Sequence, residues 1–123
     1  MTPPDGYEIR ITPWAAQQLK EEMAWSRRRW GRQHQLAYRR ALLERLERIA
    51  SGPHGCRERP ELGTGVRLVH HRGLYVVFVI NEELRQVEVI GFPNVYRELA
   101  RSVTDSLEAW RSAAGESKEW TGH

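Results

Sequence analysis

The seven-residue run LYVVFVI, residues 74–80, constrains the fold of this chain more than any other feature. All seven side chains are apolar, and most are β-branched or aromatic, which are the residue types enriched in strands. A half-buried strand alternates apolar and polar residues, whereas a strand covered on both faces does not. We therefore expect residues 74–80 to form a central strand with other layers of structure on both sides.

Three further strands are expected around this run. Residues 66–71 precede it across a tight connection, and residues 85–92 follow it after a second turn. At residues 7–12, apolar side chains alternate with charged or polar ones, which is the pattern of a half-buried strand. The three later strands are close together in the sequence and predict an antiparallel meander.

Two long amphipathic helices are predicted between the first strand and the meander. Thr12-Pro13 has the pattern of an N-cap followed by a proline in the first turn, and the apolar spacing then predicts a helix over residues 13–30. A second helix is expected over about residues 33–50, and Gly31 lies in the short turn between the two, so they form an αα-hairpin. Apolar residues that we expect on the inward faces of the pair include Trp30, Leu36, Leu43 and Leu46.

The predicted order of elements is β-α-α-β-β-β-α, an α+β domain. We expect an antiparallel β-sheet with the N-terminal αα-hairpin packed on one face. A chain of 123 residues is predicted to form a single domain over residues 1–123. Its core is expected at about residues 7–98 and its C-terminal helix at about 95–112, where Asn94 is a candidate cap. The tail, residues 113–123, is expected to be frayed.

The composition predicts neither a membrane protein nor a secreted one. No apolar run is long enough to suggest a membrane span, and the N-terminus has no signal-peptide pattern. The single cysteine, Cys56, fits a reducing compartment, so we expect a cytoplasmic protein. His54 and Cys56, with the histidines at 70 and 71, match no structural zinc spacing. No metal and no cofactor are predicted.

Positive charge is concentrated in residues 27–48, which hold eight arginines against two glutamates. Arginine binds phosphate groups in a planar, bidentate manner, so this segment is a candidate nucleic-acid surface. A solvated helix face without a partner explains the charge about as well. The candidate nucleic-acid-binding residues are Arg27, Arg28, Arg29, Arg32, Arg39 and Arg40.

Several segments in this order resemble the RelE/ParE superfamily of bacterial type II toxins. They are IRITPWAAQQL, WGRQHQLAYRRALLERLERIASGP, ELGTGVRLVH, LYVVFVINEELRQVEVI and, after the last strand, VYRE. The resemblance implies a microbial-RNase-like sheet with helices on one face and a small antitoxin that wraps and neutralises the toxin. It also implies that operator DNA is contacted only through the antitoxin complex. The implied action is either cleavage of mRNA on the ribosome or poisoning of DNA gyrase.

Cleavage of the RelE type would need no metal, because the RNA 2′-hydroxyl attacks the adjacent phosphate. A base accepts the proton, and cationic groups stabilise the charge that develops. The resemblance places Tyr96 at the functional tyrosine. The strand positions where it implies basic residues carry apolar residues, glycine or proline instead. The candidate catalytic set is therefore Tyr96 with nearby substitutes, namely Arg67, His71 and Arg72. Tyr96 also continues the apolar spacing of the C-terminal helix, so a place in the core is its alternative.

Three functions follow from the resemblance. The first, narrowly preferred from the sequence, is a ribosome-dependent mRNA endoribonuclease. The second is a gyrase inhibitor of the ParE type, which binds through the helix pair and needs no catalytic set. The third is a degenerate toxin that only binds its antitoxin or DNA. In each case the antitoxin is expected to lie against the helix pair or to displace the C-terminal helix, whose apolar stripe is Leu99, Val103, Leu107 and Trp110.

Overall fold

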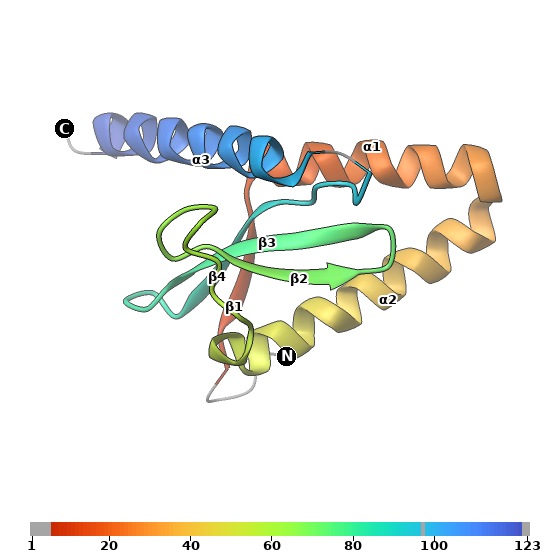
Figure 1. Ribbon diagram of the computed structural model, residues 1–123, viewed down its shortest axis with the longest axis horizontal. Coiled ribbons are helices and arrows are strands. Elements are labelled where there is room, and N and C mark those ends of the chain that lie inside the picture. The colour runs from red at the N-terminus through yellow and green to blue at the C-terminus, as the bar shows by residue number, and fades with distance from the viewer. Residues whose placement is uncertain (1–5, 97, 122–123) are drawn as a thin grey trace.

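The computed structural model describes residues 6–96 and 98–121, and within them the side chains of residues 6–96 and 98–113. Strands and α-helices follow the predicted order (Figure 1). The elements are β1 (Glu8–Ile11), α1 (Pro13–Trp30), α2 (Arg32–Ser51), the short 3-10 helix η1 (Pro53–Gly55), β2 (Arg67–His71), β3 (Leu74–Asn81), β4 (Gln86–Gly91) and α3 (Leu99–Thr121). Within the described part of the chain, no helix is long and apolar enough to cross a membrane.

The four strands form one sheet in the order β1-β4-β3-β2. Strands β2, β3 and β4 are antiparallel neighbours, as the meander predicts. Strand β1 pairs with β4 in parallel, so the sheet is mixed rather than wholly antiparallel. The pairing continues beyond β1, where the Thr12 N–H donates to the Val89 carbonyl over 3.0 Å. The chain therefore leaves β1 for α1 at the same end of the sheet at which β4 leads towards α3.

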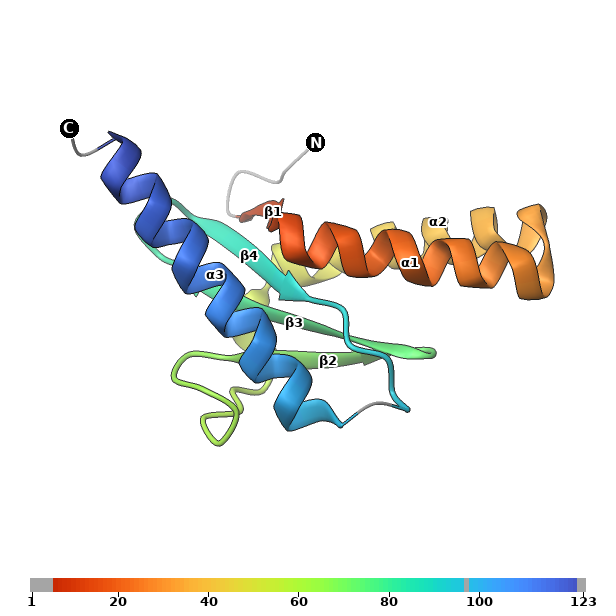
Figure 2. The same ribbon diagram turned by 90° about the horizontal axis from the view of Figure 1, so that it is seen from above.

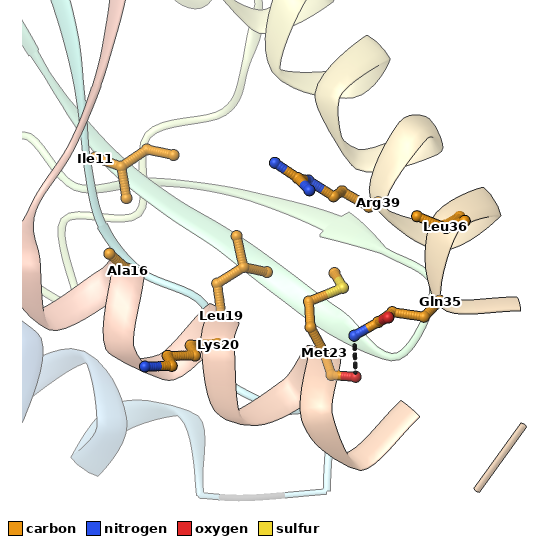
Figure 3. Close-up of a pocket in the computed structure, with 8 residues that line it drawn as sticks. All are labelled: Ile11, Ala16, Leu19, Lys20, Met23, Gln35, Leu36 and Arg39. Carbon is orange, nitrogen blue, oxygen red and sulfur yellow. Dashed lines mark hydrogen bonds between the residues drawn. The ribbon is translucent and has the colours of Figure 1, made fainter. Parts of the chain in front are cut away.

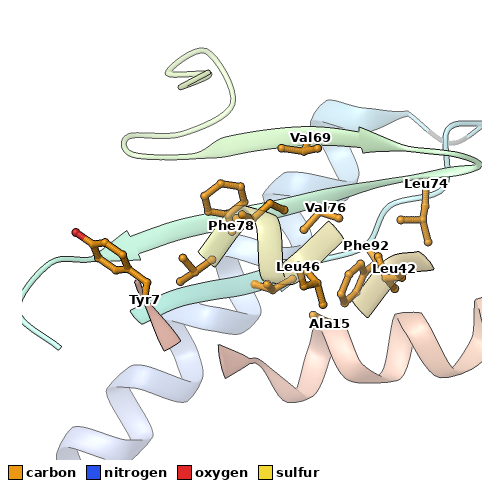
Figure 4. Packing of buried hydrophobic residues seen from close by; sticks show 12 residues of the cluster. Tyr7, Ala15, Leu42, Leu46, Val69, Leu74, Val76, Phe78 and Phe92 are labelled. Carbon is orange, nitrogen blue, oxygen red and sulfur yellow. The ribbon is translucent and has the colours of Figure 1, made fainter. Parts of the chain in front are cut away.

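Strand β3 is covered on both faces, which confirms the prediction from its apolar run. Leu74, Val76 and Phe78 belong to a core shared with α1 and α2, and Figure 4 shows this packing. Val77 and Val79, on the other face, belong to a second core shared with α3. Figure 2 shows α3 crossing the strands.

The αα-hairpin begins as predicted, but its inward face is different. The Thr12 hydroxyl accepts a hydrogen bond from the Ala15 N–H and caps α1, and Gly31, with φ of +92°, joins the two helices. Trp30, Leu36 and Leu43, which were expected to be in the core, are about half exposed. Figure 1 shows the reason, because the turn between α1 and α2 projects beyond the sheet. The buried face of α2 is supplied mainly by its C-terminal half: Leu42, Leu46, Ile49 and Ala50.

The last helix begins later and ends later than the range of about 95–112 predicts. It runs from Leu99 to Thr121, into the segment expected to be frayed, and residues 122 and 123 lie outside the described part. Before it, the chain runs alongside the start of β3: the Tyr75 N–H donates to the Pro93 carbonyl and the Val95 N–H to the Gly73 carbonyl. Asn94, expected as a helix cap, instead accepts a 2.8 Å hydrogen bond from the Tyr96 N–H in a turn.

Gly91 lies where β4 meets both α1 and α3. A Cβ at this position would be 2.4 Å from Ser106 Oγ on α3 and 3.1 Å from Gln18 Oε1 on α1. The Gln18 oxygen is fixed because it accepts the Phe92 N–H over 2.8 Å. We expect Gly91→Ala to lower the free energy of unfolding by about 1–3 kcal/mol, as overpacking does.

Urea denaturation of Gly91→Ala, alone and combined with Ser106→Ala, measures this cost. Ser106 Oγ is buried and has no hydrogen-bond partner among the described residues, so its removal is cheap. The double variant is expected to regain part of the lost stability. A Gly91→Ala protein as stable as the wild type would show that the three elements pack less closely here than described.

Candidate functional site

The four candidate catalytic residues do not meet in one place. Arg67 and His71 lie on the same face of β2, as Val69 between them does, but four residues of strand separate them by about 13 Å. His71 and Arg72 lie together at the turn between β2 and β3. Tyr96 is close to that turn in the fold, because the Val95 N–H donates to the Gly73 carbonyl.

Arg67 has a structural contact that occupies its guanidinium. Its Nη1 donates to the carbonyl of Cys56 and, over 3.4 Å, to that of His54. Both carbonyls belong to the segment at and after η1, which Arg67 ties to the edge strand β2. A guanidinium held by two backbone carbonyls serves to position the loop, and it lies at the end of β2 remote from His71.

His71 is only 8% exposed, and its Nε2 has no hydrogen-bond partner among the described residues. Its ring packs against Tyr38 of α2 in a T-shaped arrangement, with centroids 6.1 Å apart. Burial lowers the pKa of the His71 imidazole, and the positive charges of neighbouring arginines, Arg72 first among them, lower it further. The ring is therefore neutral at physiological pH and enclosed beneath Tyr38 of α2.

The lowered pKa of His71 predicts a pH dependence of stability. The unfolded chain protonates this histidine near the ordinary histidine pKa of 6.5, whereas the folded chain does so only at lower pH. Between those two values the unfolded state binds more protons, so the free energy of unfolding decreases as the pH is lowered through 6.5. The stabilisation is fully present above that pH.

Urea denaturation at pH 7.5 and pH 5.5 tests this dependence. We expect the loss of stability between the two conditions to be smaller in His71→Leu than in the wild type. His70→Asn is the matched control, because His70 is the exposed neighbour on the same strand and its charge is the smallest of the causes that lower the His71 pKa, so it is expected to reduce the loss less than His71→Leu does. Equal losses in the wild type and in His71→Leu would assign the pH dependence to other groups.

Tyr96 is 92% exposed and lies in the turn that precedes α3. It is therefore neither a core residue nor the first apolar residue of the helix. Arg72 is also exposed, in a left-handed turn conformation with φ of +54°, and its guanidinium carbon lies 6.0 Å from the centre of the Tyr38 ring. Tyr96 and Arg72 thus both lie on an open surface beside the turn between β2 and β3, and they form no enclosed site.

The six candidate nucleic-acid-binding arginines are all exposed. Arg27, Arg28, Arg29 and Arg32 surround the projecting turn between α1 and α2, and the other two, Arg39 and Arg40, follow along α2. No aspartate or glutamate occurs between Met23 and Leu43 in the sequence. The ion pairs found among the described residues are His54–Glu82 and Arg59–Glu61, so neither neutralises this surface.

A groove between α1 and α2 was not predicted from the sequence. Its volume is about 430 Å³, and Figure 3 shows its lining of Ile11, Ala16, Leu19, Lys20, Met23, Gln35, Leu36 and Arg39. Gln35 Nε2 donates to the Met23 carbonyl over 3.0 Å and joins the helices where they approach each other. The floor is mainly apolar, and Lys20 and Arg39 are its two charged residues. Helical periodicity predicted Leu36 as a core residue. Nothing in the sequence therefore indicated that this part of the two helices lines an open groove.

The apolar stripe of α3 is already used inside the protein. Val103 and Leu107 are buried against Val77, Val79 and Ile90 of the sheet, and Leu99 and Trp110 are partly buried beside them. A partner can reach the inward side of this stripe only if α3 leaves the sheet. The stripe is thus a core contact in the structure described.

Within the described ranges, no group of three or more His, Cys, Asp or Glu side chains lies close enough together to hold a metal ion. His54 Nε2 instead contacts a carboxylate oxygen of Glu82, and burial raises the pKa of the Cys56 thiol.

A family model and a solved structure both match this chain. The family described as ParE toxin of type II toxin-antitoxin system, parDE, matches residues 9–92. Among solved structures, a chain described as the chromosomal ParDE TA system from P. aeruginosa superposes with a TM-score of 0.63 at 15% sequence identity. That match covers 74% of this chain and 98% of the other. No curated protein matches the sequence significantly. At this identity the solved structure shows a shared fold, and the family match covers most of the chain.

Proposed function

The chain belongs to the ParE toxin family of type II toxin–antitoxin systems, and from this premise we propose that it is a toxin without nuclease activity that acts on DNA gyrase. The observation that carries the proposal is that Arg67 lies remote from the other three candidate RNA-cleaving residues and that His71 among those three is buried. A gyrase inhibitor binds its target and needs no catalytic set. Its place of action is the cytoplasm, where gyrase works on DNA.

Cleavage by a 2′-hydroxyl requires a base within hydrogen-bond reach of the hydroxyl and cations at the same phosphate. Arg67 donates to backbone carbonyls about 13 Å along β2 from His71. His71 is enclosed beneath Tyr38. Tyr96 and Arg72 remain accessible, but a tyrosine and one arginine on an open surface provide no enclosed phosphate site. These positions favour the binding function over the nuclease.

The surface proposed to engage gyrase is the projecting end of the αα-hairpin. It extends beyond the sheet and carries the four arginines Arg27, Arg28, Arg29 and Arg32. Gyrase acts on DNA, so a basic surface fits the complex of enzyme and DNA electrostatically. Because the tip projects beyond the sheet, it can enter a cleft without unfolding the sheet.

Two assays with the purified toxin test this function. The first measures supercoiling of plasmid DNA by gyrase, and the second measures cleavage of mRNA on translating ribosomes. We expect supercoiling to stop once the toxin is present in at least an equal molar amount, and mRNA to stay intact. Cleaved mRNA with normal supercoiling would establish the ribosomal nuclease instead. Folded toxin that is inactive in both assays would leave binding of antitoxin or DNA as its function.

The family implies a cognate antitoxin, and we propose that the groove between α1 and α2 receives it. Its apolar floor suits the apolar anchors of an amphipathic segment, and Lys20 and Arg39 suit acidic residues on either side of those anchors. Docking there leaves α3 on the sheet. The other route, in which the antitoxin displaces α3, exposes Val103 and Leu107. Hydrogen exchange separates the two routes: groove docking protects α1 and α2 and leaves residues 99–110 unchanged, whereas displacement lowers protection of residues 99–110.

A further inference from the structure

A row of aromatic rings begins at Trp30, the last residue of α1, and continues along one face of α2 towards the turn between β2 and β3. It consists of Trp30, His34 and Tyr38, spaced by four residues in the sequence. His34 and Tyr38 lie one turn apart on α2, and the turn at Gly31 places Trp30 beside His34. Their ring centroids are 5.7 Å and 6.5 Å apart, with tilts of 40° and 34°. The row ends against His71 of β2.

An arginine lies over each end of this ring row. The guanidinium carbon of Arg29 is 5.3 Å from the centre of the Trp30 ring, and that of Arg72 is 6.0 Å from the centre of the Tyr38 ring. Trp30, His34 and both arginines are exposed, and Trp30 retains 56% of its accessible surface. The ring row therefore offers aromatic faces and positive charge to the same ligand.

The inner end of the ring row contains two further polar groups. Burial raises the pKa of the Tyr38 phenol, and the charge of Glu22 raises it further, so the hydroxyl is neutral at physiological pH. His71 Nε2 is a buried polar atom without a partner among the described residues. Glu22 is occupied, because its carboxylate accepts hydrogen bonds from the Asn94 side-chain amide over 3.3 Å and 3.4 Å.

We propose that the ring row of Trp30, His34 and Tyr38 binds single-stranded nucleic acid, with bases stacked on the rings and phosphates at Arg29 and Arg72. Exposed aromatic side chains beside a basic surface are the means by which proteins hold single strands without regard to sequence. The ring centroids together span no more than about 12 Å, the length of roughly three nucleotides at duplex spacing.

Single strands fit this surface better than duplex DNA or an acidic peptide does. The bases of a duplex are stacked on one another, so only the arginines would contribute to its binding. An acidic peptide would likewise leave the rings unused, whereas every base of a single strand has an aromatic face. The inference goes beyond the proposed function, because it requires neither gyrase nor antitoxin.

Fluorescence anisotropy of a labelled 12-nucleotide single strand, titrated with the full chain in 50 mM salt, tests the proposal. We expect saturable binding that the duplex of the same sequence does not match. Trp30→Ala is expected to weaken binding by about fivefold or more, the lower limit for loss of one stacked base. His34→Ala is a second ring variant at an exposed position.

Trp25→Ala is the matched control, because Trp25 is 51% exposed on α1 and does not belong to the ring row. It is expected to change affinity by less than about twofold, since a surface side chain away from the site contributes little. Equal affinity for single strand and duplex, equal losses in Trp25→Ala and Trp30→Ala, or no binding of the single strand would each overturn the proposal. Release of the strand by polyglutamate as effectively as by unlabelled single strand would show that charge alone accounts for binding.

Discussion

Replacing Phe78 with alanine is expected to lower the free energy of unfolding by about 3–5 kcal/mol, the usual cost of removing a buried phenylalanine ring. Phe78 is fully buried in β3, in an inner strand of the sheet, and its ring belongs to the core beneath α1 and α2. Phe78 itself pairs with Arg67 of β2 and with Val89 of β4, so its backbone is held on both sides and the cavity cannot close easily. Domains are stable by only about 5–15 kcal/mol, so the loss is a large share of the total.

Urea denaturation, followed by circular dichroism at a fixed pH, measures this loss. Leu84→Ala is the control, because Leu84 lies in the turn after β3 and is 61% exposed. Leu84→Ala is expected to change the free energy of unfolding by less than about 0.5 kcal/mol. A Phe78→Ala protein that loses less than about 1 kcal/mol would be inconsistent with a strand buried on both faces.

The second large effect is expected in the groove between the helices. Leu36→Glu places a carboxylate on the wall that we assign to the antitoxin, where its apolar anchors and acidic residues would meet it. We expect the affinity for the cognate antitoxin to fall by about 30-fold or more, as it does when a central interface contact is lost. The variant should remain toxic, because the groove is not the surface proposed to engage gyrase.

Leu43→Glu provides a closely matched control. Leu43 lies on the same helix and is 49% exposed, against 47% for Leu36, but it does not line the groove. Calorimetric titration with the antitoxin is expected to separate the two variants, and co-expression of the antitoxin should rescue growth only with Leu43→Glu. Equal losses of affinity, or none in either variant, would contradict docking in the groove. Lowered hydrogen-exchange protection of residues 99–110 on binding would then point to displacement of α3.

The main elements of the fold were predictable from local patterns. The apolar run at residues 74–80 indicated an inner strand, and Thr12-Pro13 placed the start of α1 correctly. The resemblance to the RelE/ParE superfamily is confirmed by the match of the ParE toxin family to residues 9–92. The parallel pairing of β1 with β4 was not predictable, because alternation identifies a strand without identifying its neighbour.

Exposure on the helices and the position of Tyr96 depend on contacts between distant segments. Helical periodicity selected Leu36 as a core residue, but it contains no information about where the sheet ends beneath the hairpin. Tyr96 continues the apolar spacing of α3, yet the hydrogen bonds of the Tyr75 N–H to the Pro93 carbonyl and of the Val95 N–H to the Gly73 carbonyl hold it in a turn outside the helix. The four-residue spacing of Trp30, His34 and Tyr38 is visible in the sequence, whereas the contacts of their rings with one another and with Arg72 are a property of the fold.

The most direct test of the gyrase proposal is induced expression of the toxin in a bacterium without the antitoxin. DNA synthesis and protein synthesis are followed together by pulse labelling, for the wild type and for Tyr96→Phe. We expect DNA synthesis to fall first in both, because a gyrase inhibitor does not use the Tyr96 hydroxyl. An initial fall in protein synthesis that Tyr96→Phe abolishes would contradict the proposal and establish a ribosomal nuclease.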